Sequence, residues 1–165
     1  MKIVKVFSLS LLVLALSIGS AQAQFKGDKA VGANIAFGSG DNFSNLGLGA
    51  KFLYNITDPI RLEGAFTYFL KKDYVSMMDI SVYGHYLFPA GDKFTAYPLA
   101  GVGYYSTKLD FSGIGSTSHG DFAITIGGGV DYRLTSNLIL QADVKYKFVD
   151  YMDRFIISAG VAFQF

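Results

Sequence analysis

Residues 154–165 read RFIISAGVAFQF, and this stretch decides the fold. Its alternate side chains form one wholly apolar face: Phe155, Ile157, Ala159, Val161, Phe163 and Phe165. The side chains between them are mostly small or polar: Arg154, Ile156, Ser158, Gly160, Ala162 and Gln164. A period of two residues predicts a β-strand. A strand of about ten residues with one apolar face is typical of a bilayer-spanning barrel, and the alternative is the last strand of a soluble sheet.

Seven upstream segments repeat this alternation and favour the barrel. They are expected at about residues 30–38, 46–55, 60–69, 77–88, 95–105, 121–133 and 138–148. The segment 95–105 is the least clear, because both its faces are apolar and it contains Pro98. Continuing the alternation from Phe94 places these side chains outward: Ala96, Pro98, Ala100, Val102 and Tyr104.

The connections between these segments alternate between two ends of the predicted sheet. One end has the turns 56–59, 89–93 and 134–137, and the other has the connections 39–45, 70–76, 106–120 and 149–153. Segment 106–120 is rich in glycine and serine, so it is expected to be the longest loop. Together these features predict an all-β, eight-stranded antiparallel up-and-down sheet.

Charged side chains fall on only one face of the expected strands. That face carries Lys51, Arg61, Glu63, Asp79, His85, Asp131, Arg133, Asp143, Lys145, Lys147 and Arg154. A soluble barrel would place its charges outside, so the apolar face is expected to meet lipid. An open sheet edge in lipid leaves backbone groups unpaired, which requires closure into a transmembrane barrel. The interior of eight strands is just wide enough for side chains to fill, so these charges are expected to pair and to plug the lumen.

Aromatic side chains stand near both ends of the expected strands. One predicted girdle comprises Tyr54, Tyr86 and Tyr132, with Phe165 at the end of the last strand. The second comprises Phe37, Tyr68, Tyr104, Tyr146 and Phe155. Two such girdles are expected of a membrane barrel, and the ordinary strand propensity of tyrosine and phenylalanine is the alternative explanation.

Residues 1–23 have the pattern of a secretory signal peptide, which leaves residues 24–165 as one barrel domain. Lys2 and Lys5 precede an apolar run at 6–18, and cleavage is expected after Ala23 in the small-x-small sequence of residues 21–23. The sequence contains no cysteine, so the exported fold uses no disulfide. Without the two signal lysines, twelve basic residues face thirteen acidic ones, which gives no indication of nucleic-acid binding.

No catalytic, cofactor or metal site is predicted. Two histidines without any cysteine are too few for a usual zinc site. His85 is expected to belong to a polar lumen network. His119 lies in the expected loop near Ser116, Ser118 and Asp121, but a loop rich in glycine and serine does not hold a catalytic triad in place.

Ser158, Gly160, Phe163 and Phe165 are spaced in a way that resembles the C-terminal assembly signal of outer-membrane barrels. With the strand count and the short turns, residues 24–165 resemble the small eight-stranded outer-membrane β-barrel family of Gram-negative bacteria, the OmpA-barrel, OmpX and opacity-protein-like group. The resemblance implies a monomer in the cell outer membrane with both termini periplasmic. Its implied partners are outer-membrane lipid, lipopolysaccharide and the barrel-assembly machinery.

The resemblance implies a structural or surface-display role. Three alternatives are open at this stage. The outer connections could bind lipopolysaccharide, a host surface or a small ligand, and some barrels of this size modify lipid A. A soluble lipocalin-like barrel is the third, and the placement of the charges disfavours it.

Overall fold

The computed structural model describes residues 26–40, 43–72, 75–111, 115–149 and 153–165. Its elements are β1 (Lys29–Gly40), β2 (Phe43–Asn55), β3 (Ile60–Lys72), β4 (Val75–Tyr86), β5 (Phe88–Pro89), β6 (Phe94–Phe111), β7 (Gly115–Arg133), β8 (Leu138–Val149) and β9 (Arg154–Gln164). Within these ranges no helix is long and apolar enough to cross a membrane. The predicted signal peptide and its cleavage site lie outside the described residues.

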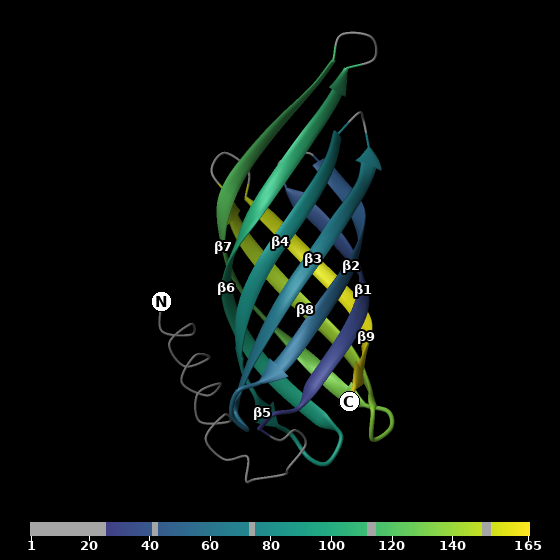
Figure 1. Cartoon of the computed structure of the whole chain (residues 1–165), viewed down its shortest axis with the longest axis vertical. Coiled ribbons are helices and arrows are strands. Elements are labelled where there is room, and N and C mark those ends of the chain that lie inside the picture. Colours follow the sequence, from purple (N-terminus) through teal and green to yellow (C-terminus); the bar gives the residue numbers. More distant parts are fainter. Residues whose placement is uncertain (1–25, 41–42, 73–74, 112–114, 150–152) are drawn as a thin grey trace, which may run out of the picture.

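The eight long strands form one closed antiparallel sheet. Neighbours along the chain pair with one another, and β4 pairs directly with β6 because the two-residue β5 forms only a short ladder on β6. The first and last strands also pair, from Ala30 opposite Gln164 to Ser39 opposite Phe155, which closes the barrel. Figure 1 shows the strands tilted around a common axis. The predicted all-β, eight-stranded antiparallel barrel is therefore confirmed.

The two ends of the barrel differ. We call the end with the turns at 56–59, 90–93 and 134–137 the short-turn end, and the C-terminus lies there (Figure 1). We call the opposite end the hairpin end, because the paired ends of β6 and β7 project there beyond the ends of the other strands (Figure 1).

The expectation that residues 106–120 form a loop is wrong. β6 and β7 continue their pairing from Tyr105 opposite Asp121 as far as Phe111 opposite Gly115. A composition rich in glycine and serine favours a loop, but the pairing of β6 with β7 inside the wall already fixes the register of both strands. Each strand then satisfies the backbone groups of the other, so tertiary pairing overrides local propensity.

Side chains alternate between the two faces of the wall as the sequence predicts. Of the outward set predicted on β6, Pro98, Ala100, Val102 and Tyr104 are exposed. Ala96 is half-buried, at the point where β5 pairs with β6. Tyr97, Leu99 and Tyr105 between them are buried inside. Outward residues are apolar throughout the wall; Ile124, for example, is 62% exposed and Val102 60%. Such exposure indicates a nonaqueous surrounding, because soluble monomers rarely expose large contiguous apolar surfaces.

The interior also contains apolar layers at its two ends. At the hairpin end one cluster comprises Ala36, Phe69, Met77, Tyr105, Ala123, Val149 and Ile156. Near the short-turn end two clusters comprise Ala30, Leu53, Ile139 and Ala162, and Tyr83, Leu87, Tyr97 and Leu99. The charged groups described below lie mainly between these layers, which limit their access to water.

Gly160 on β9 allows the backbones of β9 and β1 to pack closely on the inner face. A Cβ atom at this position would lie 2.7 Å from Asn34 Cβ and 2.8 Å from Asn34 Cα. These atoms belong to a neighbouring strand of the closed wall, so they cannot easily move away. Gly64 on β3 is the contrasting case, because a Cβ atom there would have nothing within 4 Å.

We expect Gly160→Ala to lower the free energy of unfolding by about 1–3 kcal/mol, the usual cost of overpacking a filled interior. Gly64→Ala is the matched control and should change it by no more than about 0.5 kcal/mol. Urea unfolding in detergent micelles measures both values. Equal stabilities for the two variants would contradict the close approach of β9 to β1.

Candidate functional site

The interior of the barrel gathers charged groups from six strands. Ten of the eleven residues assigned to the lumen from sequence are buried there: Lys51, Arg61, Glu63, Asp79, His85, Asp131, Asp143, Lys145, Lys147 and Arg154. The alternation of each strand directs these side chains inward, and the tilt of the strands brings residues distant in sequence to the same level.

Arg133 is the exception. It is half-buried at the short-turn end, where its Nη1 donates a hydrogen bond of 2.9 Å to the carbonyl oxygen of Ser136. Arg133 has the alternation of an inward residue, but it is the last residue of β7 and therefore lies at the end of the wall. It therefore lies at the rim and not among the ten buried groups.

The first cluster surrounds Arg61. Its Nη1 lies 2.6 Å from Asp131 Oδ2, and its Nε donates to His85 Nδ1 over 3.1 Å. Tyr97 stacks on the His85 ring at 4.6 Å between centroids, and Gln141 Nε2 donates to Asp131 over 2.8 Å. Because a guanidinium can only donate, His85 Nδ1 accepts and carries no proton. His85 is thus held inside a polar network, which leaves little freedom for it to act as a base or ligand.

The second cluster lies in the middle of the lumen around Asp143. Lys145 Nζ is 2.7 Å from Asp143 Oδ1, and Lys51 Nζ is 3.5 Å from Asp143 Oδ2. Ser158 donates a further hydrogen bond to Asp143. Lys51 also lies 3.8 Å from Glu63 Oε2, across the diagonal that the short turn between β2 and β3 sets.

The third cluster lies nearer the hairpin end. Lys147 forms an ion pair with Asp79, and its Nζ donates to Ser81 Oγ over 3.0 Å. Beyond it, Arg154 Nη2 donates to Asn45 Oδ1 over 2.6 Å, and its Nη1 bonds to the hydroxyl of Tyr105. The Arg154 guanidinium lies 5.0 Å from the ring centroid of Phe69. Ion pairs and rings thus continue toward the hairpin end.

Several interior residues were not identified from sequence. Asn45 was assigned to a loop, and Tyr97 and Tyr105 lie on the strand whose two faces are both apolar. Tyr83 is also buried inside, and Lys145 Nζ lies 5.0 Å from the centroid of its ring. The signal that identifies Tyr97 and Tyr105 is the alternation continued from Phe94.

These groups leave little free space. An interior gap bordered by Glu63, Asp79, Tyr83, Lys145 and Ser158 has a volume of about 10 Å³, which is room for about one water molecule. Within the described ranges no group of three or more histidine, aspartate or glutamate side chains is arranged to hold a metal ion. The arrangement is suited to filling the lumen.

His119 lies on the β6–β7 hairpin and not in the interior. Its Nε2 is 3.2 Å from Asp121 Oδ1, and its side chain is 76% exposed. Ser118 is also exposed on the hairpin, and the side chain of Ser116 lies outside the described residues. Catalysis by a triad requires a positioned nucleophile. The described side chains here provide only an exposed histidine–aspartate pair.

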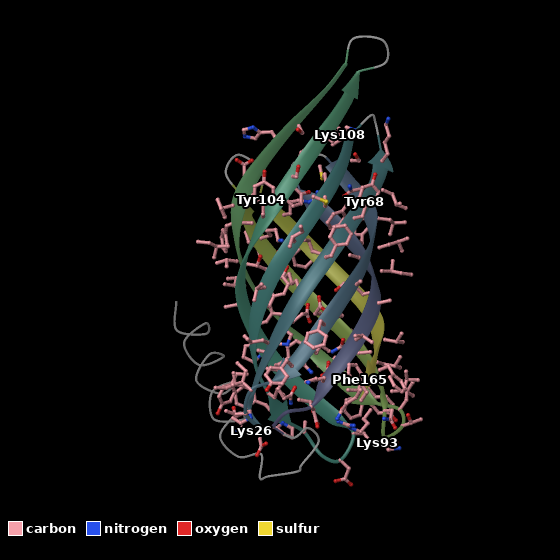
Figure 2. All side chains as sticks on the ribbon, viewed as in Figure 1. Lys26, Tyr68, Lys93, Tyr104, Lys108 and Phe165 are labelled. Carbon is pink, nitrogen blue, oxygen red and sulfur yellow. The ribbon has the colours of Figure 1, made fainter. Side chains whose placement is uncertain are left out.

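The residues expected to form aromatic girdles point away from the lumen. Seven of them are 38–48% exposed: Phe37, Tyr54, Tyr68, Tyr86, Tyr104, Tyr146 and Phe155. Tyr132 is half-buried against Phe94, at 4.7 Å between ring centroids. Figure 2 places Tyr68 and Tyr104 toward the hairpin end and Phe165 near the short-turn end.

The four residues of the expected assembly signal divide between the two faces of β9. Ser158 is buried on Asp143, and Gly160 packs against β1. Phe163 and Phe165 point outward and are 52% and 63% exposed. The backbone N–H of Phe165 donates to the carbonyl oxygen of Lys29, which extends the ladder that closes the barrel.

Comparison with known proteins adds a family and several similar folds. The family described as "Outer membrane protein beta-barrel domain" matches residues 8–165. No curated protein matches the chain.

Similar solved structures include Ail, the attachment invasion locus protein of Yersinia pestis. It has 19% sequence identity, covers 86% of this chain and 100% of its own, and has a TM-score of 0.63. Neisserial surface protein A has 20% identity, covers 84% and 96%, and has a TM-score of 0.66. OprG from Pseudomonas aeruginosa has 15% identity, covers 88% and 99%, and has a TM-score of 0.67. At these identities the likeness concerns the fold alone.

The resemblance drawn from the sequence is confirmed by the family match, which covers nearly the whole chain. The closed wall with an apolar exterior and a charged interior agrees with it. The chain therefore belongs to the outer membrane protein beta-barrel domain family and is an integral outer-membrane β-barrel protein.

Proposed function

We propose that this protein is a closed, non-conducting barrel with a structural role, which displays its β6–β7 hairpin outside the cell. The observation that carries the proposal is the pairing of the interior charges. Each of the four buried carboxylates, Glu63, Asp79, Asp131 and Asp143, has a basic side chain within 4 Å.

These ion pairs connect strands on different parts of the wall. Arg61 on β3 bonds to Asp131 on β7, and Asp79 on β4 bonds to Lys147 on β8. An ion crossing the lumen would have to displace these groups from one another in a space with little water, which is costly. The pairs therefore support a plug and argue against a porin.

We also infer that both termini and the short turns face the periplasm. An even strand count places both ends of the chain on one side, and in outer-membrane barrels the side with the short turns is periplasmic. The predicted signal peptide, with cleavage after Ala23, accounts for export. The exposed Phe163 and Phe165 support recognition by the barrel-assembly machinery. The apolar wall supports contact with outer-membrane lipid and lipopolysaccharide by a single copy of the chain.

Catalysis and loop-mediated binding have less support. The exposed His119–Asp121 pair has no positioned nucleophile among the described side chains. Ail has been solved with the heparin analogue sucrose octasulfate. The described side chains of our hairpin include one lysine, Lys108, and the register places His119 and Asp121 on the opposite face. That mixed charge does not favour a polyanion.

The direct test is electrical recording from the purified wild-type protein in a planar lipid bilayer. We expect little ion current, because the paired side chains fill the lumen. The control compares the gel mobility of unboiled and boiled samples, which shows that the inserted protein is folded. A stable and large open conductance from folded protein would contradict the structural proposal and indicate a porin.

Removing one partner of a buried pair should destabilise the barrel according to the geometry of that pair. We expect Asp131→Ala to lower the free energy of unfolding by about 3–5 kcal/mol, because Arg61 loses a carboxylate. Glu63→Ala should lower the free energy of unfolding by less. Lys51 Nζ lies 3.8 Å from Glu63 Oε2, and it keeps a second carboxylate oxygen, Asp143 Oδ2, at 3.5 Å. Urea unfolding in micelles measures both.

Arg133→Ala is the control for that series, because Arg133 lies at the rim. It should cost about 1 kcal/mol or less, the usual contribution of one hydrogen bond. If Asp131→Ala proved no more destabilising than Arg133→Ala, the pairing of interior charges would not contribute to stability as argued.

Phe165 should matter for assembly more than for the finished barrel. Phe165→Ser keeps the backbone hydrogen bond to Lys29 but removes the exposed ring, so we expect less protein in the outer membrane. The purified variant should still refold in detergent with wild-type stability. Phe122→Ser, which removes another exposed ring, is the control. Normal membrane levels of Phe165→Ser would exclude a role of the ring in recognition.

A further inference from the structure

Among the residues that the structure describes, the charges buried inside the barrel do not balance. Among the described residues the buried cations are Lys51, Arg61, Lys145, Lys147 and Arg154. The buried carboxylates are Glu63, Asp79, Asp131 and Asp143. Every carboxylate is engaged by one of the first four cations. One positive charge is therefore left over, and it is that of Arg154.

Within the described part of the chain, Arg154 is held only by neutral groups. The side chain is 1% exposed, and its two terminal nitrogens bond to Asn45 Oδ1, the Tyr105 hydroxyl and Met77 sulfur. Its Nε has no hydrogen-bond partner in the described structure. The adjacent Asp153 does not neutralise it, because that carboxylate is exposed and accepts a hydrogen bond of 3.1 Å from Tyr146.

The surroundings increase the positive potential at this point. Lys147 is the direct register partner of Arg154 on β8. Both cations flank one ring: Lys147 Nζ lies 5.9 Å and Arg154 Cζ 5.7 Å from the Tyr105 centroid. Only Lys147 has a carboxylate, Asp79. A buried cation without a counter-charge destabilises the folded protein, and so does a buried N–H donor without an acceptor. A bound anion would relieve both.

We propose that the hairpin end of the lumen binds a small inorganic anion, chloride, through the charge and the free Nε–H of Arg154. Water could satisfy Nε but would leave the charge unbalanced. A monoatomic ion fits better than an oxyanion, because the Arg154 side chain is 1% exposed and its guanidinium is enclosed by the rings of Phe69 and Tyr105. This binding site is additional to the proposed structural role.

The test is the thermal unfolding of folded protein in detergent, measured by the gel shift between folded and unfolded forms. Sodium gluconate is replaced stepwise by sodium chloride at constant ionic strength, so that general screening stays the same. We expect the unfolding temperature to rise by several degrees and to saturate, as ligand binding to the folded state requires. Inorganic phosphate, tested in the same way, should give a smaller rise.

Asn45→Asp provides the sharpest variant, because it places a carboxylate where Asn45 Oδ1 lies 2.6 Å from Arg154 Nη2. The protein then carries its own counter-charge. We expect it to unfold at a higher temperature than wild type in gluconate and to show no chloride response. Arg154→Met should also lose the response, and Arg133→Met at the other end of the barrel should keep it.

Two results would overturn the proposal. One is a wild-type unfolding temperature that is independent of chloride, which would mean that the protein itself balances Arg154. The other is a saturating chloride response that persists in Asn45→Asp, which would place the anion elsewhere. If Arg154→Met fails to fold, Asn45→Asp still decides between these outcomes.

Discussion

The wall of this barrel depends on one constraint: backbone N–H and C=O groups in hydrocarbon have no water to bond and must bond to each other. The ladders between β1 and β9 and between β4 and β6 meet this constraint by leaving neither edge of the sheet unpaired. Closure with only eight strands makes the interior narrow. Side chains from opposite parts of the wall must therefore touch, and this is why the interior charges form pairs.

The same closure explains why charges are tolerated in a place with little water. Apolar layers near the two ends limit contact with solvent, so a charge without a partner inside is costly. Such pairs add little net stability, but they make the wrong arrangement costly. A slip of one residue in any strand would turn its charges toward lipid and its apolar side chains inward. We infer that the interior network fixes the register of the wall.

Sequence predicted the wall well because alternation is a local pattern and lipid imposes it on every strand. The diagonal contact of Lys51 with Glu63 is also local in origin, since the turn at 56–59 sets that register. The sequence did not predict that Arg61 pairs with Asp131, 70 residues away, because this pairing depends on the stagger of the whole closed sheet. The hairpin at 106–120 was missed for the same reason: the barrel below, not the composition of the segment, extends its strands.

The hairpin differs from the wall in what constrains it. Residues 115–120 read GSTSHG, and their strand is held by pairing with β6 and not by an apolar face. Neither lipid nor the lumen restricts which side chains stand there, whereas both restrict the wall. Binding and recognition tend to reside on segments that a rigid scaffold positions but does not constrain chemically. We therefore infer that whatever distinguishes this protein from other small barrels resides in the hairpin and the neighbouring connections, while the plugged wall serves to anchor them.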